Sequence, residues 1–205
     1  MRVIVLGANG QLGGEVVRQV AARSHKVTAF VRQPPNGLLD QTAEIRLGDA
    51  RKREDLIAAL PGQEVVVNAI GSGSLRKNEV ESSTTAVAVA AAQQVGISRY
   101  IAMSAGMVAL DWPLFNYLLR PLIFRNIMAE HLRIEEIVKA SALRWTIVRP
   151  PKLTNGPPRG YVASLELQQR SFSVARADVA AFIADELESN KYVRQAVFVA
   201  SRRDK

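Results

Sequence analysis

The sequence predicts an α/β protein of a single domain, built on a doubly wound parallel sheet. Apolar stretches rich in β-branched residues alternate with helical stretches along the whole chain, as in parallel sheets that carry helices on both faces. The chain also begins with a strand, a glycine-rich turn and a helix, in which Gly7, Gly10 and Gly13 follow the spacing G-x-x-G-x-x-G. A length of 205 residues suits one domain, and this arrangement is typical of a Rossmann-type fold.

The first half of the chain supplies four strands and three helices. The expected strands are residues 1–6, 25–31, 43–47 and 64–70, the last of them almost entirely apolar, as in a parallel sheet buried on both faces. The expected helices are residues 15–22, 53–60 and 79–95. Pro61-Gly62 stops the second helix, and Gly96 is placed to end the Ala-rich third.

The second half continues the alternation less regularly. Strands are expected at residues 99–103, 143–148 and 196–200, with a short candidate at 171–174, and helices at 113–140 and 176–188. Pro121 is expected to kink or divide the first of these helices. The Pro/Gly-rich stretch 153–160 predicts a loop, and residues 161–168 fit no single element.

Composition excludes several classes of function. The chain has no cysteine, which excludes disulfides and thiol chemistry, and its two histidines lie far apart, so we expect no metal site. The first apolar run is too short for a signal peptide and no stretch is long enough to span a membrane, so we expect a cytoplasmic protein without a membrane partner. The net charge of +8 is spread along the chain without interleaved aromatics, and we expect no nucleic-acid partner.

The glycine motif and the residues after each strand predict a dinucleotide site. The glycines permit a tight turn, close approach of a pyrophosphate and close packing of the helix, whose N-terminus favours the phosphates. Arg32 closes the second strand, where an arginine favours the 2′-phosphate of NADP, with a solvated surface arginine as the alternative. Asp49 is a candidate for the adenine amino group or an N-cap, and Ser104 for the nicotinamide or substrate or a local cap.

With these residues the chain resembles the atypical short-chain dehydrogenase/reductases, and within them the NmrA-like group that includes biliverdin reductase B and flavin reductase. The matching segments are Gly7–Gly13, Val31-Arg32, Gly48-Asp49, Asn68–Gly71, Met103–Ala105 and Val148–Pro151. The resemblance implies that Pro150-Pro151 lie near the nicotinamide. We expect NADPH as cofactor, mainly because of Arg32, and Ser104 as the catalytic residue, whose hydroxyl would orient the nicotinamide or the acceptor. The expected cofactor-binding residues are then Gly7, Asn9, Gly10, Gln11, Leu12, Gly13, Arg32, Asp49, Ala50, Ala69, Ile70, Gly71, Pro150 and Pro151.

The chain departs from the family at the catalytic pair Tyr-x-x-x-Lys. The candidate tyrosine is Tyr117, and proline stands at the lysine position, so Tyr117 is expected to pack in the core or lid. His131 is expected to be a surface or partly buried histidine, with proton transfer as the alternative. Lys152 follows the paired prolines where biliverdin-type members have histidine, and either binds an anionic group or is solvated.

Without that pair, we expect hydride transfer to an aromatic acceptor, such as a flavin, quinone or tetrapyrrole, because the cofactor supplies the difficult chemistry. Segments at about 111–128 and 153–170 are expected to roof the acceptor site. One alternative is a non-catalytic NADP(H)-binding redox sensor, and another is an assembly factor that uses the basic surface. A monomer or a homodimer fits the sequence equally, with residues 79–95 and 113–140 as candidate dimer faces.

Overall fold

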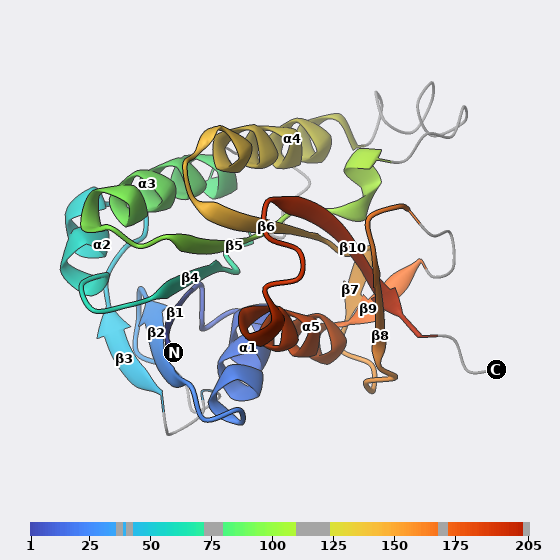
Figure 1. Cartoon of the computed structure of the whole chain (residues 1–205), viewed down its shortest axis with the longest axis horizontal. Helices are drawn as coiled ribbons and strands as arrows, with labels where there is room; N and C mark the ends of the chain where they lie inside the picture. Colours follow the sequence, from blue (N-terminus) through green and yellow to red (C-terminus); the bar gives the residue numbers. More distant parts are fainter. Residues whose placement is uncertain (36–38, 40–42, 72–79, 110–123, 168–171, 203–205) are drawn as a thin grey trace.

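The computed structural model describes residues 1–35, 39, 43–71, 80–109, 124–167 and 172–202. In these residues an eight-stranded sheet has the order β3-β2-β1-β4-β5-β6-β10-β8, and all its pairs are parallel except β10 with β8 (Figure 1). Its strands are β1 Arg2–Leu6, β2 Lys26–Val31, β3 Glu44–Leu47, β4 Val65–Asn68, β5 Arg99–Met103, β6 Arg144–Arg149, β8 Tyr161–Ser164 and β10 Gln195–Ser201. The predicted Rossmann-type sheet is therefore confirmed.

Helices cover both faces of this sheet. They are α1 Gln11–Ala21, α2 Arg53–Ala59, α3 Val80–Val95, α4 Arg125–Ala140 and α5 Arg176–Ser189, with a 3-10 turn η1 at Gly106–Ala109. Helices α1 and α5 lie on one face and α2, α3 and α4 on the other (Figure 1). None of the described helices is both long and apolar enough to cross a membrane.

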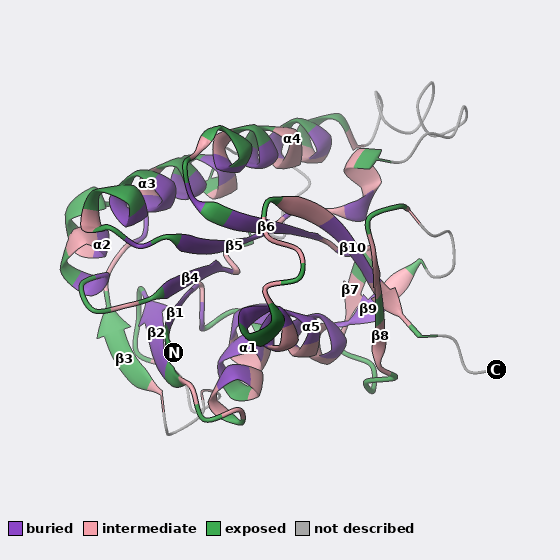
Figure 2. Cartoon of the chain, viewed as in Figure 1, coloured by how far each residue is buried: buried purple, intermediate pink, exposed green. Residues whose placement is uncertain are grey.

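Alternation along the strands builds two separate hydrophobic cores. On β1, Val3 and Val5 pack with residues of α1 and α5, whereas Ile4 and Leu6 pack with residues of α2, α3 and α4. All four side chains are fully buried, because successive residues of a strand point to opposite faces. Figure 2 shows the buried strands between helices whose outer surfaces are exposed.

The register aligns the carboxyl ends of the central strands. Leu6 at the end of β1 pairs with Phe30 on β2 and with Asn68 on β4, and Met103 on β5 pairs with Val148 on β6. The residues that follow these strands therefore share one edge. The strand order reverses between β1 and β4, and ligands of such sheets bind in the crevice outside this switch point.

The structure corrects two predicted boundaries near that edge. Helix α1 begins at Gln11 rather than at residue 15, so Gly13 and Gly14 lie inside the helix, where the sequence argues for a turn. Strand β4 ends at Asn68, two residues before the predicted end. The buried Asn68 amide donates to Thr85 and Tyr100 at 3.1 and 3.0 Å, and its oxygen accepts from the Ile70 N–H at 3.2 Å, which turns the chain away from the sheet.

The C-terminal third differs more from the prediction. The predicted loop at 153–160 overlaps a strand, β7 Lys152–Thr154, which pairs in parallel with β9 Ser173–Ala175 in a second, two-stranded sheet. Residues 161–164 form β8, the antiparallel edge strand. Helix α4 confirms the predicted helix from residue 125 onward, and its expected earlier part, with Pro121, lies outside the described residues.

Candidate functional site

The glycine loop after β1 is packed too closely for side chains at two positions. Gly7 has φ +77°, and a Cβ there would lie 2.9 Å from the Ile70 side chain. A Cβ on Gly13 would lie 2.2 Å from the carbonyl oxygen of Gly7, so only glycine lets the first turn of α1 approach the loop this closely. The Gly10 N–H donates to the Gly7 carbonyl at 2.9 Å, which closes the turn.

The N-terminus of α1 is suited to bind an anion. Gly10 is its N-cap, no described side chain caps the helix, and its first turn carries no acidic residue. Free N–H groups and the helix dipole there attract phosphate groups. The Asn9 side chain donates to the Gln33 carbonyl at 2.8 Å and so ties the loop to the segment after β2. The glycine loop of residues 7–10 and the N-terminus of α1 therefore form a glycine cradle that fits the pyrophosphate of a dinucleotide.

A first cavity of about 630 Å³ extends from this loop across the ends of β2 and β4. Its lining includes nine of the residues expected from the sequence: Gly7, Asn9, Gly10, Arg32, Asp49, Ala50, Ala69, Ile70 and Gly71. It also includes Arg51, which was not predicted as a site residue. The cavity combines the helix N-terminus with two arginines, which suits a ligand that carries several negative charges.

Asp49 and Arg51 form a close ion pair at the rim of this cavity. Arg51 Nε donates to the two carboxylate oxygens of Asp49 at 2.9 and 3.0 Å, and these side-chain hydrogen bonds lower the pKa of Asp49 to about 2. The charge of the exposed Arg32 acts in the same direction on this pKa. Asp49 does not cap α2, whose N-cap is Lys52, so the N-cap alternative is wrong.

A second cavity, of about 530 Å³, continues over the ends of β5 and β6. It shares Gly10, Ala69, Ile70 and Gly71 with the first cavity, so the two form one groove across the edge of the sheet. The expected residues that line it in addition are Gln11, Leu12, Ser104, Pro150 and Pro151. Apolar side chains border it on several sides, among them Met103, Ile127 and Leu153.

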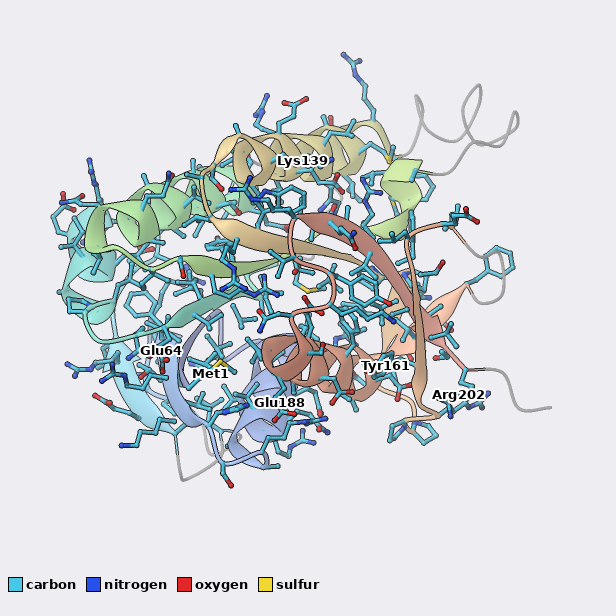
Figure 3. All side chains as sticks on the ribbon, in the orientation of Figure 1. Met1, Glu64, Lys139, Tyr161, Glu188 and Arg202 are labelled. Atoms are coloured by element: carbon cyan, nitrogen blue, oxygen red, sulfur yellow. The ribbon has the colours of Figure 1, made fainter. Side chains whose placement is uncertain are left out.

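Ser104 lies at this second cavity, but its hydroxyl proton already has an acceptor. The Ser104 Oγ donates to Glu135 Oε1 at 2.9 Å, and both residues are buried. Arg149 donates to the two oxygens of Glu135 at 2.8 and 2.6 Å, and Lys139, one turn further along α4 (Figure 3), donates at 2.7 Å. Toward a ligand, the Ser104 oxygen is therefore left as a hydrogen-bond acceptor.

The Glu135 carboxylate is stabilised in its charged form. Burial alone would raise its pKa, but the hydrogen bonds from Arg149 and Lys139 outweigh this effect and lower the pKa of Glu135 below its ordinary value. This cluster was not foreseen, because Glu135 comes from the middle of a helix and carries no motif. Its spacing of four residues to Lys139 was the one local signal.

His131 and Lys152 also line the second cavity. His131 is partly buried on α4, as expected, and Lys152 is exposed at the start of β7. Next to His131, the buried Glu130 accepts hydrogen bonds from the backbone and hydroxyl of Ser82 at 2.8 and 2.9 Å. Tyr117 lies outside the described residues.

The structure thus places the expected site residues along one groove, except Gly13, which packs behind the glycine loop. Their roles toward a ligand stay predictions. Of the two expected lid segments, the described parts contribute Asn126, Ile127 and Leu153 to the second cavity. Arg51 and Arg176 line the groove without having been predicted, because a single arginine outside a motif carries no positional signal.

Comparison with known proteins agrees with this geometry. A family described as NAD(P)H-binding matches residues 7–190. An uncharacterized sugar epimerase, YhfK of Bacillus subtilis (strain 168), is 30% identical, over 96% of this chain and 92% of its own length. The family match confirms the resemblance to NAD(P)-binding proteins that was inferred from the sequence.

Two solved structures share the fold. ChuY, an anaerobillin reductase from Escherichia coli O157:H7, superimposes with a TM-score of 0.81 at 21% identity, over 100% of this chain and 99% of the other. A short-chain dehydrogenase/reductase from Veillonella parvula DSM 2008 in complex with NADP gives a TM-score of 0.80 at 22% identity, over 98% and 94% of the two chains. By the family match and the glycine cradle together, the chain belongs to the NAD(P)H-binding family.

Proposed function

We propose that the protein is an NADPH-dependent reductase that delivers hydride to an aromatic acceptor of the flavin, quinone or tetrapyrrole type. The observation that carries the proposal is the pair of adjoining cavities that make up the groove across the switch point. The first cavity suits the adenosine phosphate half of NADPH, and the second leaves room for the nicotinamide and an acceptor. Cavities of a few hundred Å³ with apolar walls are typical of small-molecule sites.

Each part of the groove has a task in this proposal. The N-terminus of α1 holds the pyrophosphate, Arg32 meets the 2′-phosphate, and Asp49 and Ala50 border the adenine. Ile70 and Gly71 contact the ribose. The nicotinamide supplies the hydride, and the chain positions the rings and excludes water. The apolar side chains of Met103, Ile127 and Leu153 favour a flat ring system over a polar alcohol.

The Ser104 hydroxyl acts as a positioning group in this scheme. Because its proton is donated to Glu135, its oxygen can accept a hydrogen bond from the carboxamide N–H₂ of the nicotinamide or from a donor on the acceptor. It cannot at the same time donate to a carbonyl oxygen. This arrangement argues against carbonyl–alcohol chemistry, which needs a proton donor at the reacting oxygen.

A titration followed by an acceptor test separates the proposal from the redox-sensor alternative. We expect purified protein to bind NADPH, and addition of FMN or a quinone to cause a decay of the NADPH absorbance. Binding without turnover over several flavins and quinones would favour the sensor, which the engaged Ser104 hydroxyl also allows. No binding of either NADPH or NADH would contradict both functions.

Replacement of Arg32 by alanine tests the cofactor preference. A charged hydrogen bond to the 2′-phosphate is worth about 1.5–3 kcal/mol, so we expect NADPH affinity to fall roughly 10- to 100-fold and NADH affinity to stay unchanged. Arg46→Ala is the matched control, since Arg46 is also exposed, pairs with Glu44 on β3 and does not line the groove. An unchanged NADPH-to-NADH affinity ratio in Arg32→Ala would show that the preference has another source.

A further inference from the structure

The second cavity, in which we place the acceptor, is lined by a histidine ring that can exchange a proton. The proposed reductase function does not yet give this histidine a role. His131 lies on α4 and lines the second cavity together with Ser104, Pro150 and Lys152. Its Nδ1 is buried and makes no hydrogen bond to the described part of the chain. A buried ring nitrogen without a partner is uncommon, because it loses the hydrogen bonds that water provided. His25 Nε2 is also buried without a hydrogen bond among the described residues, but of the two histidines His131 is the one that lines the cavity, where a bound ligand can supply the partner.

The neighbouring groups leave little choice of proton donor among the described residues. The Ser104 proton is donated to Glu135, and Glu135 is held as a carboxylate by Arg149 and Lys139. Glu130 accepts two hydrogen bonds from Ser82 and is therefore also an acceptor. Of the described residues that line this cavity, His131 is the one whose side chain ordinarily exchanges a proton near neutral pH.

We propose that His131 donates the proton that accompanies hydride transfer to the acceptor. This inference rests on the proposed reductase function. The acceptor gains a hydride at one ring atom and takes the proton of the His131 imidazolium at the atom where negative charge develops. The products are the reduced acceptor and the oxidised nicotinamide nucleotide, and the neutral imidazole takes a new proton from solvent. One hydride and one proton are thus transferred in each turnover, and the sum balances.

Burial and the neighbouring charges act in opposite directions on the pKa of His131, and burial has the larger effect. Burial lowers the pKa of His131 below the ordinary histidine value. The carboxylates of Glu81 on α3 and of Glu130 and Glu135 on α4 act on this pKa in the opposite direction. Two cations, Lys152 on β7 and Arg176 on α5, line the same cavity. The net shift is downward, so the imidazolium form gains population as the pH falls, and turnover should rise with it.

The test compares His131→Gln with wild type and with His25→Gln. Glutamine keeps the size and hydrogen bonding of the ring but cannot titrate. His25 is the only other histidine and precedes β2, at the opposite edge of the sheet, so its replacement controls for a general loss of histidine. With NADPH and FMN, we expect kcat of His131→Gln to fall roughly 100-fold and its rise toward acid pH to disappear. His25→Gln should match wild type.

A second readout does not depend on turnover. NMR of ¹⁵N-labelled protein detects the histidine rings. Because the chain has two histidines, their ring signals are assigned by comparing wild type with His131→Gln and His25→Gln. We expect FMN, added to the protein with NADP⁺, to shift the His131 signals and its titration midpoint, while the His25 signals stay in place. Unshifted His131 signals would overturn the inference.

The kinetic outcomes distinguish this inference from the function on which it rests. Wild-type turnover with an unchanged rate and pH profile in His131→Gln would overturn the role of His131 and leave the reductase intact. Absence of turnover in wild type would overturn the reductase and the proton-donor role with it. A fall in kcat with the acid limb retained would make His131 a packing residue and would equally reject the proposal.

Discussion

Replacing Gly13 by alanine is expected to destabilise the protein by about 3 kcal/mol and to weaken NADPH binding at least about tenfold. The added Cβ would lie 2.2 Å from the Gly7 carbonyl oxygen and 2.9 Å from the Cα of Ala8, and backbone atoms cannot rotate away. Helix α1 would have to move outward, although Leu12, Val16 and other side chains hold it in the core. The displaced N-terminus would no longer present its N–H groups to the pyrophosphate.

The neighbouring glycine provides the control for this prediction. A Cβ on Gly14 would lie 3.6 Å from the Ala8 carbonyl oxygen, which is an ordinary contact. Gly14→Ala should therefore stabilise the helix by up to about 1 kcal/mol, as in other helix interiors. Urea unfolding and NADPH fluorescence titration measure both effects. Equal stability of the two variants would show that α1 does not need its close approach to the loop.

Replacing Glu135 by alanine is the second change with a large expected effect, a loss of about 3 kcal/mol of stability. Glu135 is 2% exposed and balances Arg149 and Lys139 while accepting the Ser104 proton. Without it, Arg149 keeps a charge in a largely buried position. Lys139 reaches solvent, so the loss is expected near the lower end of the range for broken buried ion pairs.

Glu136 on the exposed side of the same helix is the matched control for Glu135. Glu136→Ala should change stability by less than about 0.5 kcal/mol in urea unfolding. If both variants unfold at the same urea concentration, the buried cluster contributes nothing to stability.

The stability of the protein at acidic pH should depend on the charged cluster of Glu135, Arg149 and Lys139. Because the folded-state pKa of Glu135 is lowered, its contribution is fully present above the ordinary glutamate pKa and is lost as the pH falls through the folded value. The stability of Glu135→Ala should therefore fall less steeply than that of wild type as the solution is acidified. Thermal unfolding midpoints at a series of acidic pH values measure this difference.

Much of the groove could be predicted because its residues are tied to local patterns. Gly7, Arg32 and Ser104 each follow directly after a strand, and parallel strands bring their carboxyl ends to one edge. Strand β7 was not predicted because it has only three residues and the prolines and glycines around it favour a loop. The start of α1 was missed because glycine argues against a helix unless the helix must approach another backbone closely.

The sequence by itself determined most of the sheet, the glycine loop and the family, because the alternation of strands and helices and the residues that follow each strand are local patterns. Only the tertiary structure decided the partners of the chemical groups. The Ser104 hydroxyl donates to Glu135, 31 positions away in the sequence. The packing of α4 against the sheet brings His131 to the second cavity. Hydrogen bonds between distant elements depend on how helices pack, and packing is a property of the whole core rather than of any local pattern.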